Sequence, residues 1–74
     1  MCTLDDLEMG EEGQIKEINC NNSIKRRMMD LGIIKGTTIT PILKSPAGNP
    51  KAYEVRGSII AIRSEDAKSI EIIK

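Results

Sequence analysis

The sequence contains no histidine, tryptophan or phenylalanine, and Tyr53 is its single aromatic residue. The absence of histidine removes the commonest general base of enzymes and the commonest transition-metal ligand of proteins. A chain of 74 residues is also too short for most enzyme folds that bury a substrate. Small RNA-binding barrels stack bases on aromatic side chains, which are almost missing here. The composition therefore predicts a protein that is not an enzyme, and it disfavours an RNA-binding barrel.

Long apolar runs and clustered cysteines are missing as well. The longest uninterrupted apolar run is Ile59–Ile62, far short of the roughly 20 residues that span a bilayer. Cys2 and Cys20 form no C-x-x-C pair, and two isolated cysteines are typical of free thiols in a reducing compartment. We therefore expect a cytoplasmic protein without direct membrane insertion.

The chain has no net charge, because 11 Lys and Arg balance 11 Asp and Glu. The charges are nevertheless segregated, with a net −5 in residues 1–20, +6 in residues 21–63 and −1 in residues 64–74. Overall neutrality removes bulk attraction to nucleic acid or to an anionic membrane, so we expect no nucleic-acid partner. The basic middle either meets acidic residues and water, or serves as a docking surface.

Isoleucine is abundant, with thirteen residues. β-Branched side chains pack well on a pleated surface, and they favour short strands. Turn-forming residues separate the apolar segments and leave one helix, at residues 24–31. We expect a mainly β, partly open barrel of about five strands with one internal α-helix, formed by a single domain over residues 1–74. The expected strands are residues 14–18, 37–44, 51–55, 58–63 and 69–73.

The expected helix has a start, a buried face and an end. The segment Asn21-Asn22-Ser23 supplies N-cap chemistry before the first turn. Ile24, Met28 and Leu31 recur at i, i+4 and i+7, which predicts a narrow buried stripe. Gly32 follows as the residue that stops the helix in the left-handed conformation.

Two positions in the expected strands carry structural information. Pro41 lies inside the strand at residues 37–44, and proline donates no hydrogen bond to a ladder, so we expect an edge or a bulge there. Arg56 and Gly57 join two strands as a two-residue hairpin in which glycine supplies the positive φ.

A basic cluster on the helix is the candidate binding surface. Arg26 points away from the predicted stripe, Arg27 flanks it, and Met29 lies well off it. Arginine and methionine are enriched at protein interfaces, although a solvated helix face is the plainer alternative. The turn-rich loop at residues 45–50 is expected to wall a groove beside them. The predicted partner-binding residues are Arg26, Arg27, Met29, Pro46 and Asn49.

A metal-binding alternative rests on the two thiols. Cys2, Cys20 and the N-terminal carboxylates combine soft and hard ligands that hold Zn²⁺ or Fe²⁺. They would make the chain a direct carrier or sensor of either ion, bound weakly. The sequence contains no phosphate-binding loop and no recognised ligand spacing, so the metal site itself stays unknown.

Taken in order, the motifs resemble those of the ferrous-iron-transport protein A family, the FeoA-like domains. The most specific segment is Arg26-Arg27-Met28-Met29-Asp30-Leu31-Gly32-Ile33, followed by Lys35-Gly36-Thr37. The remaining motifs are Leu4-x-x-Leu7-x-x-Gly10-x-x-Gly13-x-Ile15, Pro46-Ala47-Gly48-Asn49-Pro50, Val55-Arg56-Gly57 and Ile60-Ala61-Ile62-Arg63.

This resemblance implies a small SH3-like barrel. It also implies a cytosolic accessory of bacterial ferrous-iron uptake, which acts on a membrane permease that carries a GTPase domain. Our leading hypothesis is therefore a protein-interaction module that binds the cytosolic GTPase region of the permease and supports or regulates transport. Direct binding of Fe²⁺ or Zn²⁺ is the alternative.

Overall fold

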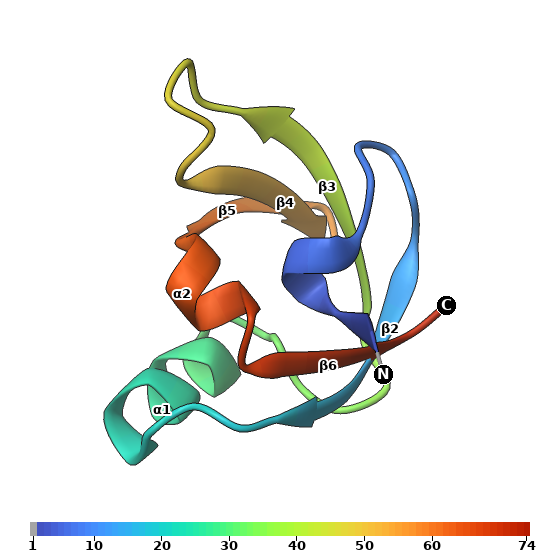
Figure 1. Cartoon of the computed structure of the whole chain (residues 1–74). Coiled ribbons are helices and arrows are strands. Elements are labelled where there is room, and N and C mark those ends of the chain that lie inside the picture. The colour runs from blue at the N-terminus through green and yellow to red at the C-terminus, as the bar shows by residue number, and fades with distance from the viewer. Residues whose placement is uncertain (1) are drawn as a thin grey trace.

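The computed structural model describes residues 2–74, so Met1 of the expected domain lies outside the described residues. All strands join one antiparallel sheet in the order β1-β6-β2-β3-β4-β5, which curves around the short 3₁₀ turn η1 (Figure 1). The helices α1 and α2 lie together at one end of this sheet. The elements are β1 Cys2–Thr3, η1 Leu4–Asp6, β2 Gly13–Ile18, α1 Asn22–Asp30, β3 Thr38–Lys44, β4 Lys51–Val55, β5 Ser58–Ile62, α2 Ser64–Ala67 and β6 Ile70–Ile73.

The expected mainly β, partly open barrel with an internal helix is confirmed, but the sheet has one strand more than expected. The extra strand, β1, is two residues long and pairs with β6 through Cys2 opposite Ile72 and Thr3 opposite Glu71. A pair of residues is too short to show the alternation by which strands are recognised in a sequence. Within residues 2–74, no helix is long and apolar enough to cross a membrane.

The core is aliphatic and surrounds Tyr53, which has no exposed surface. Each strand from β2 to β6 contributes inward side chains, and η1, α1 and α2 close the ends. Apolar burial of this kind stabilises the fold by roughly 25 cal/mol per Å². The buried hydrophobic residues are Leu4, Leu7, Ile15, Ile18, Met28, Ile33, Ile39, Tyr53, Val55, Ile62, Ala67, Ile70 and Ile72.

Helix α1 begins at Asn22, two residues before the expected start, and its cap is the first residue of the predicted capping segment. The Asn21 side chain accepts a hydrogen bond from the Ile24 N–H at 3.0 Å, which satisfies one of the free donors of the first turn. Met28 is buried and Ile24 is partly buried against the core, so the first two positions of the predicted stripe are confirmed.

The third position of the stripe is wrong, because Leu31 is 41% exposed. Gly32 adopts a φ of +86°, and the Ile33 N–H then bonds to the Met28 carbonyl at 2.9 Å. This closing motif turns the chain at the end of α1 and brings the residue after glycine back onto the last turn. Ile33 therefore occupies the core place that helical spacing assigned to Leu31.

Both expectations about the strands are confirmed. Pro41 lies opposite Tyr53, and the register between β3 and β4 then shifts before Leu43, as expected for a bulge. At the hairpin, Gly57 has a φ of +82°. Arg56 also has a positive φ, +53°, because a turn of this kind places both central residues in the left-handed region.

Candidate functional site

Helix α1 has a groove on each flank, and these two grooves are the candidate binding sites. We call the first the arginine groove. It encloses about 230 Å³ between α1, α2 and β5, and Arg27 and Arg63 supply its positive charge. It is lined by Ile24, Arg27, Met28, Leu31, Pro50, Ile60, Ala61, Ile62, Arg63 and Asp66.

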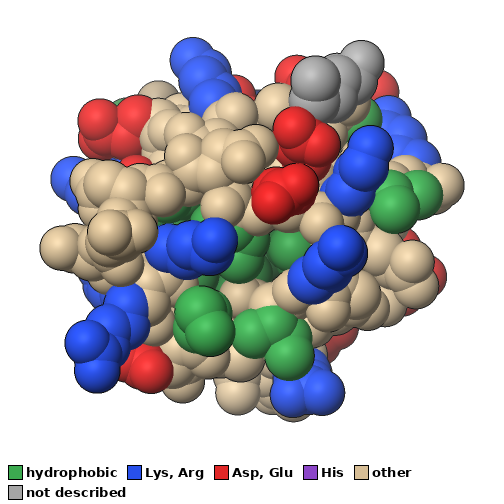
Figure 2. Space-filling model, turned by 90° about the horizontal axis from the view of Figure 1, so that it is seen from below, with side chains coloured by type: hydrophobic (Ala, Val, Ile, Leu, Met, Phe, Trp, Pro, Cys, Tyr) green, Lys and Arg blue, Asp and Glu red, His purple; other side chains and the backbone are tan. Residues whose placement is uncertain are grey.

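The second, which we call the lysine groove, lies on the opposite flank of α1 and encloses about 290 Å³. Figure 2 shows hydrophobic side chains gathered at the centre of the face seen from below, with Lys and Arg side chains around them. The lysine groove is lined by Lys16, Glu17, Ile18, Lys25, Met29, Ile34 and Lys35.

A bulge in β2 builds one side of the lysine groove. The β2–β6 register advances by two residues on β2 but only one on β6, since Ile15 faces Ile72 and Glu17 faces Glu71. Lys16 and Glu17 are both exposed as a result, while Ile18 still points into the core. Without the extra residue, strict alternation would place Glu17 inward.

A tight turn builds the other side. The Thr37 N–H bonds to the Ile34 carbonyl at 3.0 Å, and Gly36 has a φ of +89°, as the third residue of a type II turn requires. The Gly36 N–H donates to the Ile15 carbonyl at 2.7 Å, so the turn is fastened to β2. Ile34 and Lys35 are thereby held beside the β2 bulge.

The structure distributes the predicted partner-binding residues over different surfaces. Arg27 lines the arginine groove and Met29 lines the lysine groove, whereas Arg26 is exposed and lines neither. Pro46 is exposed in the loop, and the Asn49 amide oxygen accepts a hydrogen bond from the Ser64 N–H at 3.0 Å. That bond ties the loop to the start of α2, and the neighbouring Pro50 reaches the arginine groove.

Of the seven residues that line the lysine groove, only Met29 was among the predicted partner-binding residues. Lys16, Ile34 and Lys35 lie on a strand and in a turn, separate from the helix cluster in the sequence. The long-range hydrogen bonds of Ile15 with Gly36 and Thr37 bring them together. The sequence signal for this part of the groove is the turn pattern Lys35-Gly36-Thr37, which directly follows Ile34.

The electrostatics of the two grooves differ. In the arginine groove, Arg63 pairs with Glu65 and with Asp66, both at 3.6 Å. The lysines of the other groove, Lys16, Lys25 and Lys35, form no ion pair among residues 2–74; the remaining pairs join Lys51 to Asp5 and Lys74 to Glu11. With three lysines against Glu17, the lysine groove is the more positive of the two, because the arginine groove has Arg27 and Arg63 against Asp66.

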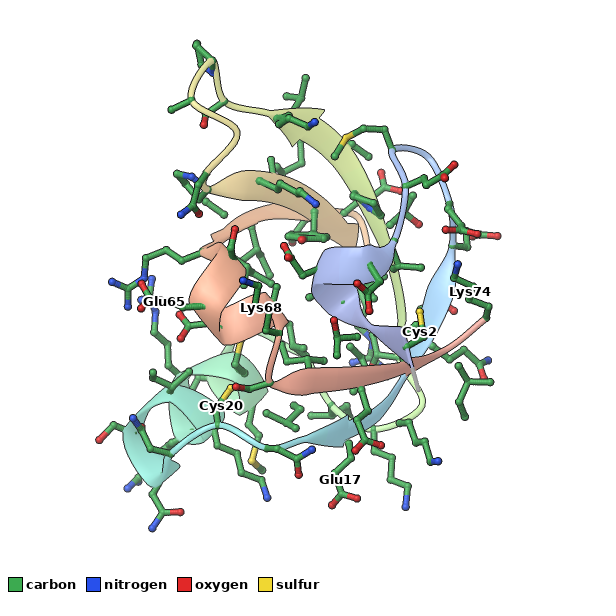
Figure 3. The ribbon with its side chains drawn as sticks, in the orientation of Figure 1. Cys2, Glu17, Cys20, Glu65, Lys68 and Lys74 are labelled. Carbon is green, nitrogen blue, oxygen red and sulfur yellow. The ribbon has the colours of Figure 1, made fainter. Side chains whose placement is uncertain are left out.

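The residues of the metal-binding alternative do not assemble. Figure 3 shows Cys20 beside the helices and Cys2 near the far end of β6. Burial, and secondarily Asp66, raises the pKa of the Cys20 thiol, which disfavours the thiolate that metals bind. Within residues 2–74, no three His, Cys, Asp or Glu side chains are grouped so as to hold a metal ion. The donors present therefore do not fit an Fe²⁺ or Zn²⁺ site.

Known proteins with similar sequences point to one family. The family model described as the FeoA domain matches residues 2–74. A Campylobacter jejuni protein is 30% identical over 70 residues, which are 95% of this chain and 95% of the relative. A Porphyromonas gingivalis Fe(2+) transport protein A/Fe(2+) transporter FeoB fusion protein is 28% identical over 69 residues, 93% of this chain, and the match spans only 8% of that protein.

A solved structure supports the fold assignment. Stenotrophomonas maltophilia FeoA, crystallised with zinc and described as a procaryotic SH3 domain protein, superposes with a TM-score of 0.84. It is 26% identical, and the match covers 97% of this chain and 89% of that one. The expected SH3-like barrel is confirmed. With a family model that matches nearly its whole length, this chain belongs to the FeoA-domain family.

Proposed function

We propose that this chain is a cytoplasmic accessory protein of bacterial ferrous-iron uptake that acts as a protein-interaction module. Its partner in this proposal is the cytosolic GTPase region of a FeoB-type permease. The observation that carries the proposal is the Porphyromonas gingivalis relative, in which a related domain and the transporter form one polypeptide. Covalent fusion raises the effective concentration of two modules for each other, which benefits partners that work together.

The surface chemistry supports binding and not catalysis. The sequence has no histidine, and its exposed features are apolar grooves with cationic side chains at their edges. In this proposal the permease contacts the exposed face of α1 through Arg26, Arg27 and Met29, and Pro46 and Asn49 of the loop at residues 45–50 are further contacts on a separate surface. Arginine and methionine at such positions give both charge and adaptable apolar area.

Capture of the purified cytosolic region of the permease by this chain tests the proposal. We expect the double charge reversal Arg26→Glu with Arg27→Glu to weaken capture while the circular dichroism spectrum and the melting temperature stay close to those of the wild type. The matched control is Lys44→Glu with Lys68→Glu, which makes the same change of charge on exposed lysines that line neither groove. Unchanged capture by the α1 variant would overturn the docking assignment, and no capture by the wild type would overturn the partner.

A further inference from the structure

We propose that the lysine groove binds an acidic peptide segment, in which one or two aliphatic side chains are flanked on both sides by Asp or Glu. This inference rests on the proposed function, because it names the chemistry that the permease or another protein partner presents to α1. It assigns the recognition to Lys16, Lys25 and Lys35 around a floor of Ile18, Met29 and Ile34.

The floor of the groove supplies the apolar part of the argument. Met29 is 53% exposed and Ile34 is 39% exposed, and buried Ile18 continues the surface between them. An exposed apolar patch with polar residues at its rim is typical of a site that binds a protein or a ligand. The volume of about 290 Å³ lies at the lower end of ligand pockets, so it fits one or two side chains and not a whole folded element.

The rim supplies the charge. Lys16 comes from β2, Lys25 from the first half of α1 and Lys35 from the turn, so three separate elements place cations around one hollow. None of the three has an acidic partner among residues 2–74. Charges of one sign around an apolar floor select a partner of the opposite sign and speed its association, even where each single pair adds little affinity.

Glu17 sets an orientation for the bound segment. It lines the same groove, and it is the single acidic residue among the seven lining residues. A carboxylate there repels a ligand that is anionic along its whole length, such as a phosphate chain. A peptide whose apolar centre is flanked by acidic residues reduces this repulsion, because its carboxylates face the three lysines and its apolar side chains lie on the floor.

The groove is held in its open shape before any partner arrives. The 2.7 Å hydrogen bond from the Gly36 N–H to the Ile15 carbonyl fixes the distance between the turn and the β2 bulge. The Ile15 N–H also donates to the Thr37 carbonyl, at 2.9 Å. A site whose walls are already positioned loses less conformational entropy on binding, which favours even a short ligand.

One segment of this chain has the same chemistry as the proposed ligand. Met9 is exposed in the turn after η1 and is surrounded in the sequence by Glu8, Glu11 and Glu12. Insertion of this turn into the lysine groove of a second copy would join copies of this chain to one another. We assign the groove to a separate acidic peptide, and self-association through Met9 is the competing result that the experiment must distinguish.

The test uses the whole chain and a fluorescent capped hexapeptide, Asp-Glu-Leu-Met-Glu-Asp, followed by anisotropy at low and at physiological salt. One control peptide carries Lys at every acidic position, and another carries Ser in place of Leu and Met. The protein variants are Lys16→Glu with Lys35→Glu, and Met29→Ser. Their matched controls are Lys44→Glu with Lys68→Glu, and Leu43→Ser at another exposed apolar position.

We expect saturable binding of the acidic peptide below about 1 mM, weaker at higher salt, and no binding of either control peptide. The lysine variant and Met29→Ser should each weaken binding about tenfold, which corresponds to about 1.4 kcal/mol, whereas the control variants bind like the wild type. No saturation by about 1 mM overturns the proposal, and so does equal binding by the lysine variant.

Two further results separate this inference from the proposed function. If the permease region is captured and Lys16→Glu with Lys35→Glu leaves capture unchanged, the groove assignment is wrong and the proposed function stands. If the peptide binds as expected and the permease region does not, the groove assignment stands and the partner is wrong. Concentration-dependent association that Met9→Ser abolishes, measured by light scattering, would assign the groove to a second copy and overturn the proposal.

Discussion

Gly13 lies directly against Ile72, so closely that a Cβ at residue 13 would overlap the Cγ2 methyl group of Ile72. The two methyl groups of Leu7 close the space from the other side, at 3.2 and 3.3 Å from the same point. The backbone of Gly13 is not in the left-handed region, unlike that of five other glycines. Glycine is therefore required here by lack of space, at the place where β2, β6 and the segment after η1 meet.

Gly13→Ala should destabilise the fold by about 1–3 kcal/mol, because the added methyl group overpacks a core that has no room for it. Urea denaturation measures the loss. Ile72→Leu removes the branched methyl group that causes the overlap, and alone it should cost less than about 1.5 kcal/mol. The double variant should recover part of the loss of Gly13→Ala, and strictly additive effects would contradict this packing relationship.

Tyr53 predicts an alkaline limit to stability. Burial, with a smaller contribution from Asp5, raises the pKa of Tyr53 from 10 to about 12. Above pH 10 the unfolded chain releases the phenolic proton while the folded chain keeps it, so the free energy of unfolding falls as the pH rises from 10 to 12. Two pKa units correspond to about 2–3 kcal/mol across this window.

Because Tyr53 is the only tyrosine, the ultraviolet absorbance of tyrosinate reports this group alone. Tyr53→Phe is the control, and it should remove the part of the alkaline destabilisation that tyrosine causes. Among residues 2–74 the hydroxyl has no hydrogen-bond partner, so the same substitution should change stability at neutral pH by no more than about 1 kcal/mol. A tyrosinate transition centred at pH 10 in the folded protein would contradict the burial argument.

Met28 and Leu31 should respond differently to truncation, although both lie on the face that helical spacing assigns to the core. Met28→Ala removes a buried side chain and should cost about 2–4 kcal/mol. Leu31→Ala should cost less than about 1 kcal/mol, because Leu31 is largely exposed and Ile33 fills the core in its place. Equal losses in urea denaturation would show that α1 packs as the simple stripe predicts.

Asn49 should act as a brace for the loop that carries it. Asn49→Ala removes the acceptor of the Ser64 N–H, and loss of one such bond costs about 0.5–1.5 kcal/mol. Hydrogen exchange of the Ser64 amide measures this directly, and its protection should fall in the variant. Pro46→Ala is the matched change in the same loop, and it should leave that amide protected. Equal protection of the Ser64 amide in the wild type and in Asn49→Ala would overturn the bracing role.

Local signals in the sequence predict most of the fold. The isoleucine-rich segments predict five of the six strands, and the capping segment at residues 21–23 and Gly32 predict the start and the end of α1 to within two residues. The prediction that Leu31 is buried is wrong because helical periodicity does not account for the turn that closes α1. The hydrogen bonds of that turn bring Ile33 into the core in place of Leu31. The two-residue strand β1 was not predicted, because it forms only by pairing with β6.

The candidate site was less predictable than the fold. Helical spacing correctly separates Met29 from the buried face, but the predicted docking surface grouped Met29 with Arg27, and the two side chains line different grooves. Lys16 and Lys35 are far apart in the sequence, and they share a groove only because a bulge and a turn are bonded to each other. A local pattern contains no information about such a tertiary contact.

The extra residue in β2 separates the side chains that line the lysine groove from the side chains that form the core. Lys16 and Glu17 both point outward at the bulge, so either can be exchanged without disturbing Ile15 or Ile18 in the core. Lys35 has the same freedom on its turn. Reversal of these charges would redirect the groove toward a basic partner at little cost in stability. The binding preference of the lysine groove can therefore be changed by single surface substitutions that leave the core intact.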